Sequence, residues 1–278
     1  MGEREPAWLS PDSLEEALRL RDEHGDDATV LAGGTFLGIL MNQGFLSPAA
    51  FLSLGRVAGL GGVEPAGESL RLGAMATHTA VERSDAVRAG WPALARAFGL
   101  VASPRVRNQA TVGGVLADAD YASDPPAMLA ALGAQVVLRS ARGERKVTVD
   151  ELILGYYETC IAPDELLVEV VVPPAPERAV YRKFRSRSTE DRPCVAVAAT
   201  HDDGRVRVVV GAVAEVPQHF PDVCALADGQ PLEPALREEI ARRYAERVEP
   251  MADARGSAAY RSRVIEVEVR RALEELAA

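Results

Sequence analysis

The sequence predicts an α+β protein of two domains. In the first part of the chain, short apolar segments run into glycine turns that are followed by residues at helical spacing. Pro173-Pro174-Ala175-Pro176 interrupts this pattern as a linker would. Beyond it, three strand-like segments precede two long helical segments, which indicates a small antiparallel sheet covered by helices. We therefore expect domains at residues 1–173 and 178–278.

The first elements are expected to be helix, strand and helix. Ser10-Pro11 is a suitable helix cap and first turn, and apolar residues recur at helical spacing until His24-Gly25. An apolar strand over residues 28–32 leads directly into Gly33-Gly34. A second helix is then expected up to Gly44.

The remaining elements follow from the same patterns. In the first domain we expect strands at 51–54, 69–72, 135–139, 146–149 and 166–172, helices at 73–81, 91–101 and 126–132, and a polar turn at 103–109 before Gly113-Gly114. In the second domain we expect strands at 180–184, 195–200 and 206–213 and helices at 233–247 and 258–276.

Charge and composition exclude several classes of function. The chain has 31 basic and 41 acidic residues, and this net charge of −10 argues against nucleic acid or an anionic membrane as the main partner. No apolar run approaches the roughly 20 residues that cross a bilayer, and the first residues do not form a signal-peptide core. We expect a cytoplasmic protein without a membrane span.

Cysteine and histidine spacing predicts no metal site. Cys160, Cys194 and Cys224 lie far apart, so they alone can build neither a zinc ribbon nor an iron–sulfur cluster. The four histidines are equally scattered, without paired spacing. Buried cysteines and isolated histidines are the expected outcome.

The two glycine pairs, Gly33-Gly34 and Gly113-Gly114, are the candidate binding elements. Backbone N–H groups in a glycine turn can reach a diphosphate because no side chain intervenes, and Thr35 and Thr111 offer hydroxyl groups beside them. A single such pair is more often a tight turn, whereas two in one domain favour binding modestly. Neither pair satisfies G-x-G-x-x-G or the P-loop pattern, so a bound dinucleotide would be held by another geometry.

Asp124 and the basic residues around Lys183 have two interpretations each. Asp124 could accept hydrogen bonds from a ribose or adenine edge, but capping the helix that follows it is the favoured interpretation. The run from Arg182 to Arg187 could face a ligand or the acidic surface of a partner. Alternation along a strand favours a solvated face instead.

In order and spacing, these segments resemble the FAD-binding subunits of molybdenum hydroxylases, which include the medium subunit of aerobic carbon monoxide dehydrogenase and the flavin domain of xanthine dehydrogenase. Leu31–Thr35 is similar to the first flavin loop of that family and Arg107–Gly114 to the second. The resemblance continues through Leu72-Gly73-Ala74 with Thr77, Ser123-Asp124 with Pro126, Asp164–Leu167, Tyr181, Lys183, Phe184, Asp191, Asp253, Arg255-Gly256-Ser257, Tyr260-Arg261 and Arg270–Leu273.

The resemblance implies a fold, a cofactor and a set of binding residues. A PCMH-type domain of two α+β subdomains would hold extended FAD, and a smaller C-terminal α+β domain would cover the flavin side. Residues implied for the diphosphate and ribityl chain are Val30, Leu31, Ala32, Gly33, Gly34, Thr35, Phe36, Leu37, Ala110, Thr111, Gly113, Gly114 and Val115. Those implied for the nucleotide half are Asp118 and Asp124, and those for the isoalloxazine are Val101, Leu167 and Lys183. No catalytic residue is expected, because the cofactor carries the redox chemistry.

The resemblance also implies partners. Electrons would come from iron–sulfur clusters on a small subunit, after substrate oxidation at molybdopterin on a large subunit, and pass through FAD to an acceptor. Phe36 and Val115 depart from the polar residues of the family, which leaves FAD affinity and the choice among NAD, quinone, ferredoxin and oxygen open. Two alternatives remain: a stand-alone flavoenzyme acting on a small molecule, and a scaffold subunit that has lost FAD.

Overall fold

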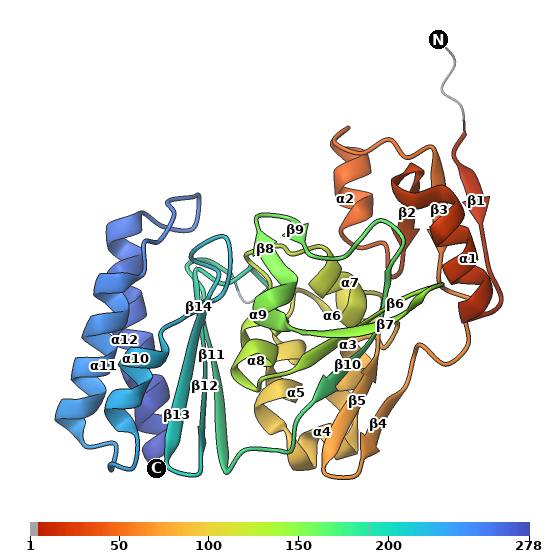
Figure 1. Ribbon diagram of the computed structural model, residues 1–278. Coiled ribbons are helices and arrows are strands. Elements are labelled where there is room, and N and C mark those ends of the chain that lie inside the picture. Colours follow the sequence, from red (N-terminus) through yellow and green to blue (C-terminus); the bar gives the residue numbers. More distant parts are fainter. Residues whose placement is uncertain (1–4, 189) are drawn as a thin grey trace.

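The first unit of the fold is a small parallel sheet. The computed structural model describes residues 5–188 and 190–278, and Figure 1 shows its three main sheets following one another along the chain. The first has the strand order β1-β3-β2 and carries helices α1 and α2. Its elements are β1 (Ala7–Leu9), α1 (Leu14–His24), the 3-10 turn η1 (Gly25–Asp27), β2 (Ala28–Leu31), α2 (Leu37–Asn42) and β3 (Ala50–Ser53).

The second unit is an antiparallel sheet in the order β4-β5-β10-β6-β7. Its strands are β4 (Val63–Ala66), β5 (Ser69–Gly73), β6 (Gln135–Ser140), β7 (Gly143–Thr148) and β10 (Leu166–Val172), with a small hairpin β8 (Ile153–Gly155) and β9 (Glu158–Thr159). Its helices are α3 (His78–Arg83), α4 (Asp85–Gly90), α5 (Pro92–Gly99), α6 (Pro104–Arg107), α7 (Val112–Ala117), α8 (Pro125–Ala131) and α9 (Val149–Leu152).

The third unit is a four-stranded antiparallel sheet whose outer face carries the helices drawn in blue in Figure 1. Its elements are β11 (Arg178–Phe184), β12 (Val195–Asp202), β13 (Arg205–Gly211), β14 (Gln218–His219), α10 (Pro221–Cys224), η2 (Ala225–Ala227), α11 (Pro234–Arg247) and α12 (Ala258–Ala277). The predicted α+β class is confirmed, and the predicted strands and helices follow one another in the expected order, with further elements between them.

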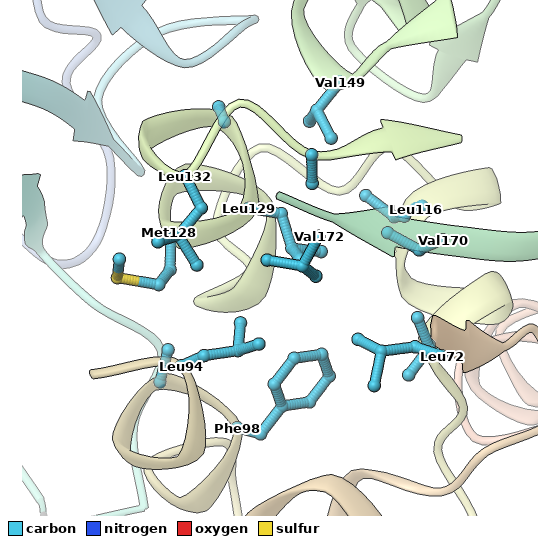
Figure 2. Close-up of a cluster of buried hydrophobic side chains, with 14 of the residues drawn as sticks. Leu72, Leu94, Phe98, Leu116, Met128, Leu129, Leu132, Val149, Val170 and Val172 are labelled. Carbon is cyan, nitrogen blue, oxygen red and sulfur yellow. The ribbon is translucent and has the colours of Figure 1, made fainter. Parts of the chain in front are cut away.

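One hydrophobic core joins the second and third units. Figure 2 shows Phe98 of α5 and Met128 of α8 among side chains from the antiparallel sheet, such as Leu72. Along β12, Ala196 packs into this core, whereas its neighbour Val195 packs into the separate core under α11 and α12. Because successive side chains along a strand point to opposite faces of the sheet, both faces of this sheet are buried, each in a different core. The region before the linker and the region after it are consequently held in contact.

Three local predictions are wrong because capping side chains begin the helices elsewhere. Ser13, not Ser10, caps α1 by accepting a hydrogen bond from the Glu16 N–H. The helix expected over 73–81 begins only at His78, where Thr77 supplies the cap. Gly113-Gly114, expected as a glycine turn after a polar segment, instead forms the first turn of α7, which Thr111 caps.

Some elements were not predicted at all. The polar turn expected at 103–109 contains α6, which starts at Pro104. Strand β4 contains Pro65 and lies at the edge of its sheet, where a missing N–H is tolerated. Such a segment lacks the alternation that identifies a strand in sequence.

Candidate functional site

A cavity of about 540 Å³ lies where the first two units and β11 meet. Its wall comes from the loop between β2 and α2, from α7 and the residues after it, and from β10 and β11. Every residue predicted to bind cofactor lines it, apart from Leu31, whose side chain packs beside Gly34. A volume of this size is typical of small-molecule and cofactor sites.

The loop of residues 33–36 brings free backbone donors to the cavity wall. A Cβ on Gly33 would lie 1.9 Å from the carbonyl oxygen of Gln109, so only glycine permits this contact between the two predicted flavin loops. Gly34 has φ +68°, which also favours glycine. No described residue accepts a hydrogen bond from the N–H groups of residues 33–36. These donors can bind an anionic group such as a diphosphate.

The second glycine pair differs from what its sequence suggests. Gly113 donates its N–H to the Ala74 carbonyl at 2.8 Å, and Gly114 donates to Thr111 Oγ1 at 3.1 Å. A Cβ on Gly113 would lie 2.8 Å from the Cβ of Ala74. The expected free N–H groups are thus already bonded, and Gly113 instead allows α7 to approach the chain at Ala74.

Lys183 and Asp124 form a buried ion pair at the cavity wall. Lys183 Nζ donates to Asp124 Oδ2 and to the Leu100 carbonyl, both at 2.8 Å, and the two side chains are 1% and 3% exposed. Tyr181 Oη donates to Asp124 Oδ1 at 2.7 Å. Burial lowers the pKa of Lys183 and raises that of Asp124, and in each case the partner's charge opposes the change.

This arrangement corrects two sequence interpretations. The Asp124 side chain does not cap α8, because its two carboxylate oxygens accept hydrogen bonds from Tyr181 and Lys183 of β11. Lys183 does not lie on a solvated face: it shares its face of β11 with Tyr181, whereas Arg182 points the other way and pairs with Glu268 of α12. The pair therefore links the second unit to the third beside the cavity.

Two further carboxylates lie on the cavity wall after α7. Burial, reinforced by the charge of Asp120, raises the pKa of Asp118 to about 7, and none of the hydrogen bonds or ion pairs among the described residues involves its carboxyl group. Asp120 is paired with Arg192 at 2.8 Å. Asp118 is thus available to a hydroxyl or amine donor in the cavity.

His78 also lines the cavity and was not singled out by sequence. Its ring is 1% exposed, lies edge-on to Phe98 at 5.0 Å, and has Nε2 3.3 Å from the Thr111 carbonyl. Burial lowers the pKa of His78 to about 4, so the ring is neutral at pH 7. An isolated histidine has no spacing signal, and its place depends entirely on how α3 packs against the Thr111 segment.

The pKa of Asp118 leads to a pH prediction. The folded chain holds this proton up to about pH 7, whereas the unfolded chain releases it near the ordinary aspartate pKa of 3.8. Between these values the folded state binds more protons, so the stability of the flavin-free chain should fall as pH rises from 4 to 7. Asp118→Asn should remove this part of the slope. Urea unfolding of both proteins across that pH range checks it, and parallel pH profiles would contradict it.

Residues 5–188 and 190–278 contain neither a helix that could cross a membrane nor a cluster of metal-binding side chains. Within these ranges, no helix has the length and apolar character needed to cross a bilayer. The same residues contain no group of three or more His, Cys, Asp or Glu side chains placed to hold a metal ion. Cys194 and Cys224 are buried, and Cys160 is half-buried.

Two protein-family models match the chain. Residues 3–175 match the FAD binding domain in molybdopterin dehydrogenase. Residues 179–276 match the CO dehydrogenase flavoprotein C-terminal domain. Together the two matches cover nearly the whole sequence.

Curated relatives and solved structures agree with these matches. The nicotine 6-hydroxylase medium subunit of Paenarthrobacter nicotinovorans is 34% identical over 98% of this chain and 97% of its own length. The carbon monoxide dehydrogenase medium chain of Afipia carboxidovorans is 32% identical over 95% of this chain and 94% of its own. A chain of carbon monoxide dehydrogenase from Hydrogenophaga pseudoflava superposes with a TM-score of 0.91 at 31% identity, covering 99% of this chain and 98% of that one.

Proposed function

This chain belongs to the family of the FAD binding domain in molybdopterin dehydrogenase, and we propose that it is the FAD-binding, electron-transferring subunit of a molybdenum hydroxylase-type complex. The proposal rests on this family membership together with one observation: the predicted binding residues line a single cavity. When bound, FAD supplies the redox chemistry, taking up electrons from one partner and releasing them to another.

The residues of the chain supply binding and electrostatics. The N–H groups of residues 33–36 would hold the diphosphate, and Asp118 would accept a hydrogen bond from a hydroxyl group of the cofactor. Lys183, already bonded to Asp124 and Leu100, keeps a third N–H donor for the cavity. The apolar side chains of Val101, Val115 and Leu167 would exclude water from the bound rings.

The complex would contain two further kinds of subunit. Relatives are named as medium subunits or chains, which implies large and small partners, and we propose that these carry molybdopterin and iron–sulfur clusters respectively. The electron acceptor and the cytoplasmic location stay predictions. We also propose domains at 1–173 and 178–278, a division supported by the two family matches on either side of the linker.

The proposal predicts a flavin spectrum and co-purifying partners. Purified from its source, the chain should show FAD absorbance at about one flavin per chain and should elute with two other subunits. Isolation of the chain alone with activity on a small molecule would favour the stand-alone flavoenzyme instead. If FAD fails to bind even when added in excess, the scaffold alternative replaces the proposal.

A further inference from the structure

Two aromatic rings meet across the segments that border the cavity. Phe36, which lines the cavity, stacks on Tyr157 with ring centroids 5.6 Å apart and planes 11° from parallel. Phe36 precedes α2, and Tyr157 lies between β8 and β9 (Figure 1). Tyr157 does not itself line the cavity and is 50% exposed. The Phe36 ring therefore packs against a tyrosine ring that is half exposed to solvent.

The backbone at Tyr157 is held in an unusual conformation. Its φ is +58°, in the left-handed region that a tyrosine rarely occupies, and its N–H donates to the Ala119 carbonyl at 3.2 Å. Ala119 itself has φ +44°. A bulky residue in this conformation costs free energy, so the fold must hold it there through other contacts. The stack with Phe36 is one such contact.

The same border carries an ion pair. Arg192, from the loop between β11 and β12, pairs with Asp120, and its positive charge opposes the rise that burial causes in the pKa of Tyr157. Tyr157 thus contacts Phe36 of the first unit and Ala119 of the second, and lies within the electrostatic influence of Arg192 from the third. Three segments that are distant in sequence converge on one exposed ring.

We propose that the Phe36–Tyr157 stack is a gate on the cavity, in which Tyr157 acts as a positioning residue that holds Phe36 across the entrance. An occupant entering or leaving has to separate the two rings. An offset aromatic pair resists separation by an amount that corresponds to roughly a two- to tenfold change in rate. The gate thus sets how fast the cofactor exchanges and leaves the strength of its binding nearly unchanged.

The inference rests on the proposed function, with FAD as the occupant, and exchange kinetics test it. The full-length chain, after removal of its flavin, is mixed with FAD, and both the association and the dissociation rates are followed by flavin fluorescence. Tyr157→Gly removes the ring and suits the positive φ, so the fold is not threatened. Both rates should rise about two- to tenfold while their ratio stays nearly constant.

Three matched variants complete the test. Phe36→Ala should accelerate exchange as Tyr157→Gly does, and Tyr157→Phe, which keeps the ring, should restore slow exchange. Phe45→Ala changes a 77% exposed ring that does not line the cavity and should leave both rates unaltered.

Each contrary outcome has a distinct meaning. Unchanged rates in Tyr157→Gly would overturn the gate while FAD binding by the unaltered chain stood. Suppose that Phe36→Ala binds FAD more weakly at an unchanged association rate, and that Tyr157→Gly exchanges FAD as the unaltered chain does. Phe36 would then contact the cofactor directly, and the gate would also be overturned. If the unaltered chain bound no FAD, the proposed function would fail first.

Discussion

Gly33→Ala is expected to abolish tight FAD binding. The new Cβ would lie 1.9 Å from the carbonyl oxygen and 2.7 Å from the carbonyl carbon of Gln109, and both are backbone atoms that cannot swing aside as a side chain can. The two loops must therefore separate. Overpacking of this kind typically costs about 1–3 kcal/mol of stability, and displaced donors should weaken FAD binding by about 100-fold, or about 2.7 kcal/mol.

Gly38→Ala is the matched control for this substitution. Gly38 lies in α2, five residues further along, and a Cβ there would meet nothing within 4 Å. Alanine should stabilise the helix by up to about 1 kcal/mol and leave the cavity unchanged. Urea unfolding and titration of the flavin-free chain with FAD measure both effects. Tight FAD binding by Gly33→Ala would show that the two loops need not touch.

Lys183→Met is expected to be the most destabilising single change beside the cavity. It leaves the Asp124 carboxylate, 3% exposed, with Tyr181 as its remaining donor, and it leaves the Leu100 carbonyl without its Lys183 donor. Removing one member of a buried pair costs about 3–5 kcal/mol, because the other charge stays buried without compensation. Asp124→Asn should be costly for the same reason, since the Lys183 ammonium loses its counter-charge.

The double variant Lys183→Met, Asp124→Asn distinguishes pairing from packing. Both charges are gone, and the asparagine can still accept the hydrogen bond from Tyr181, so the double variant should be more stable than the sum of the single effects implies. Arg19→Ala, which breaks a pair whose side chains are 63% and 58% exposed, should cost less than about 1 kcal/mol. Strict additivity of the two buried changes in urea unfolding would contradict an energetic coupling between Lys183 and Asp124.

Local chemistry made much of the first domain predictable. Caps, glycine turns and apolar periodicity act over a few residues, and they located β2, α8 and β6 to within one residue, whereas β7 begins three residues earlier than predicted. Errors arose where several caps compete, as at Ser10 and Ser13, or where an edge strand lacks alternation, as in β4. The order and spacing of short segments then identified the family, since each segment alone was weak.

The sequence by itself determined the fold class through local patterns and the family through the order and spacing of its segments. The resemblance to that family then pointed to many residues that line the cavity, but not to His78. Only the tertiary structure decided what these residues touch. In the structure, Gly33 contacts Gln109 and Phe36 stacks on Tyr157. Asp124, expected to cap a helix, instead forms an ion pair with Lys183. Steric contacts and buried ion pairs form between residues that packing brings together. The periodicity of one segment does not specify which distant segment will pack against it.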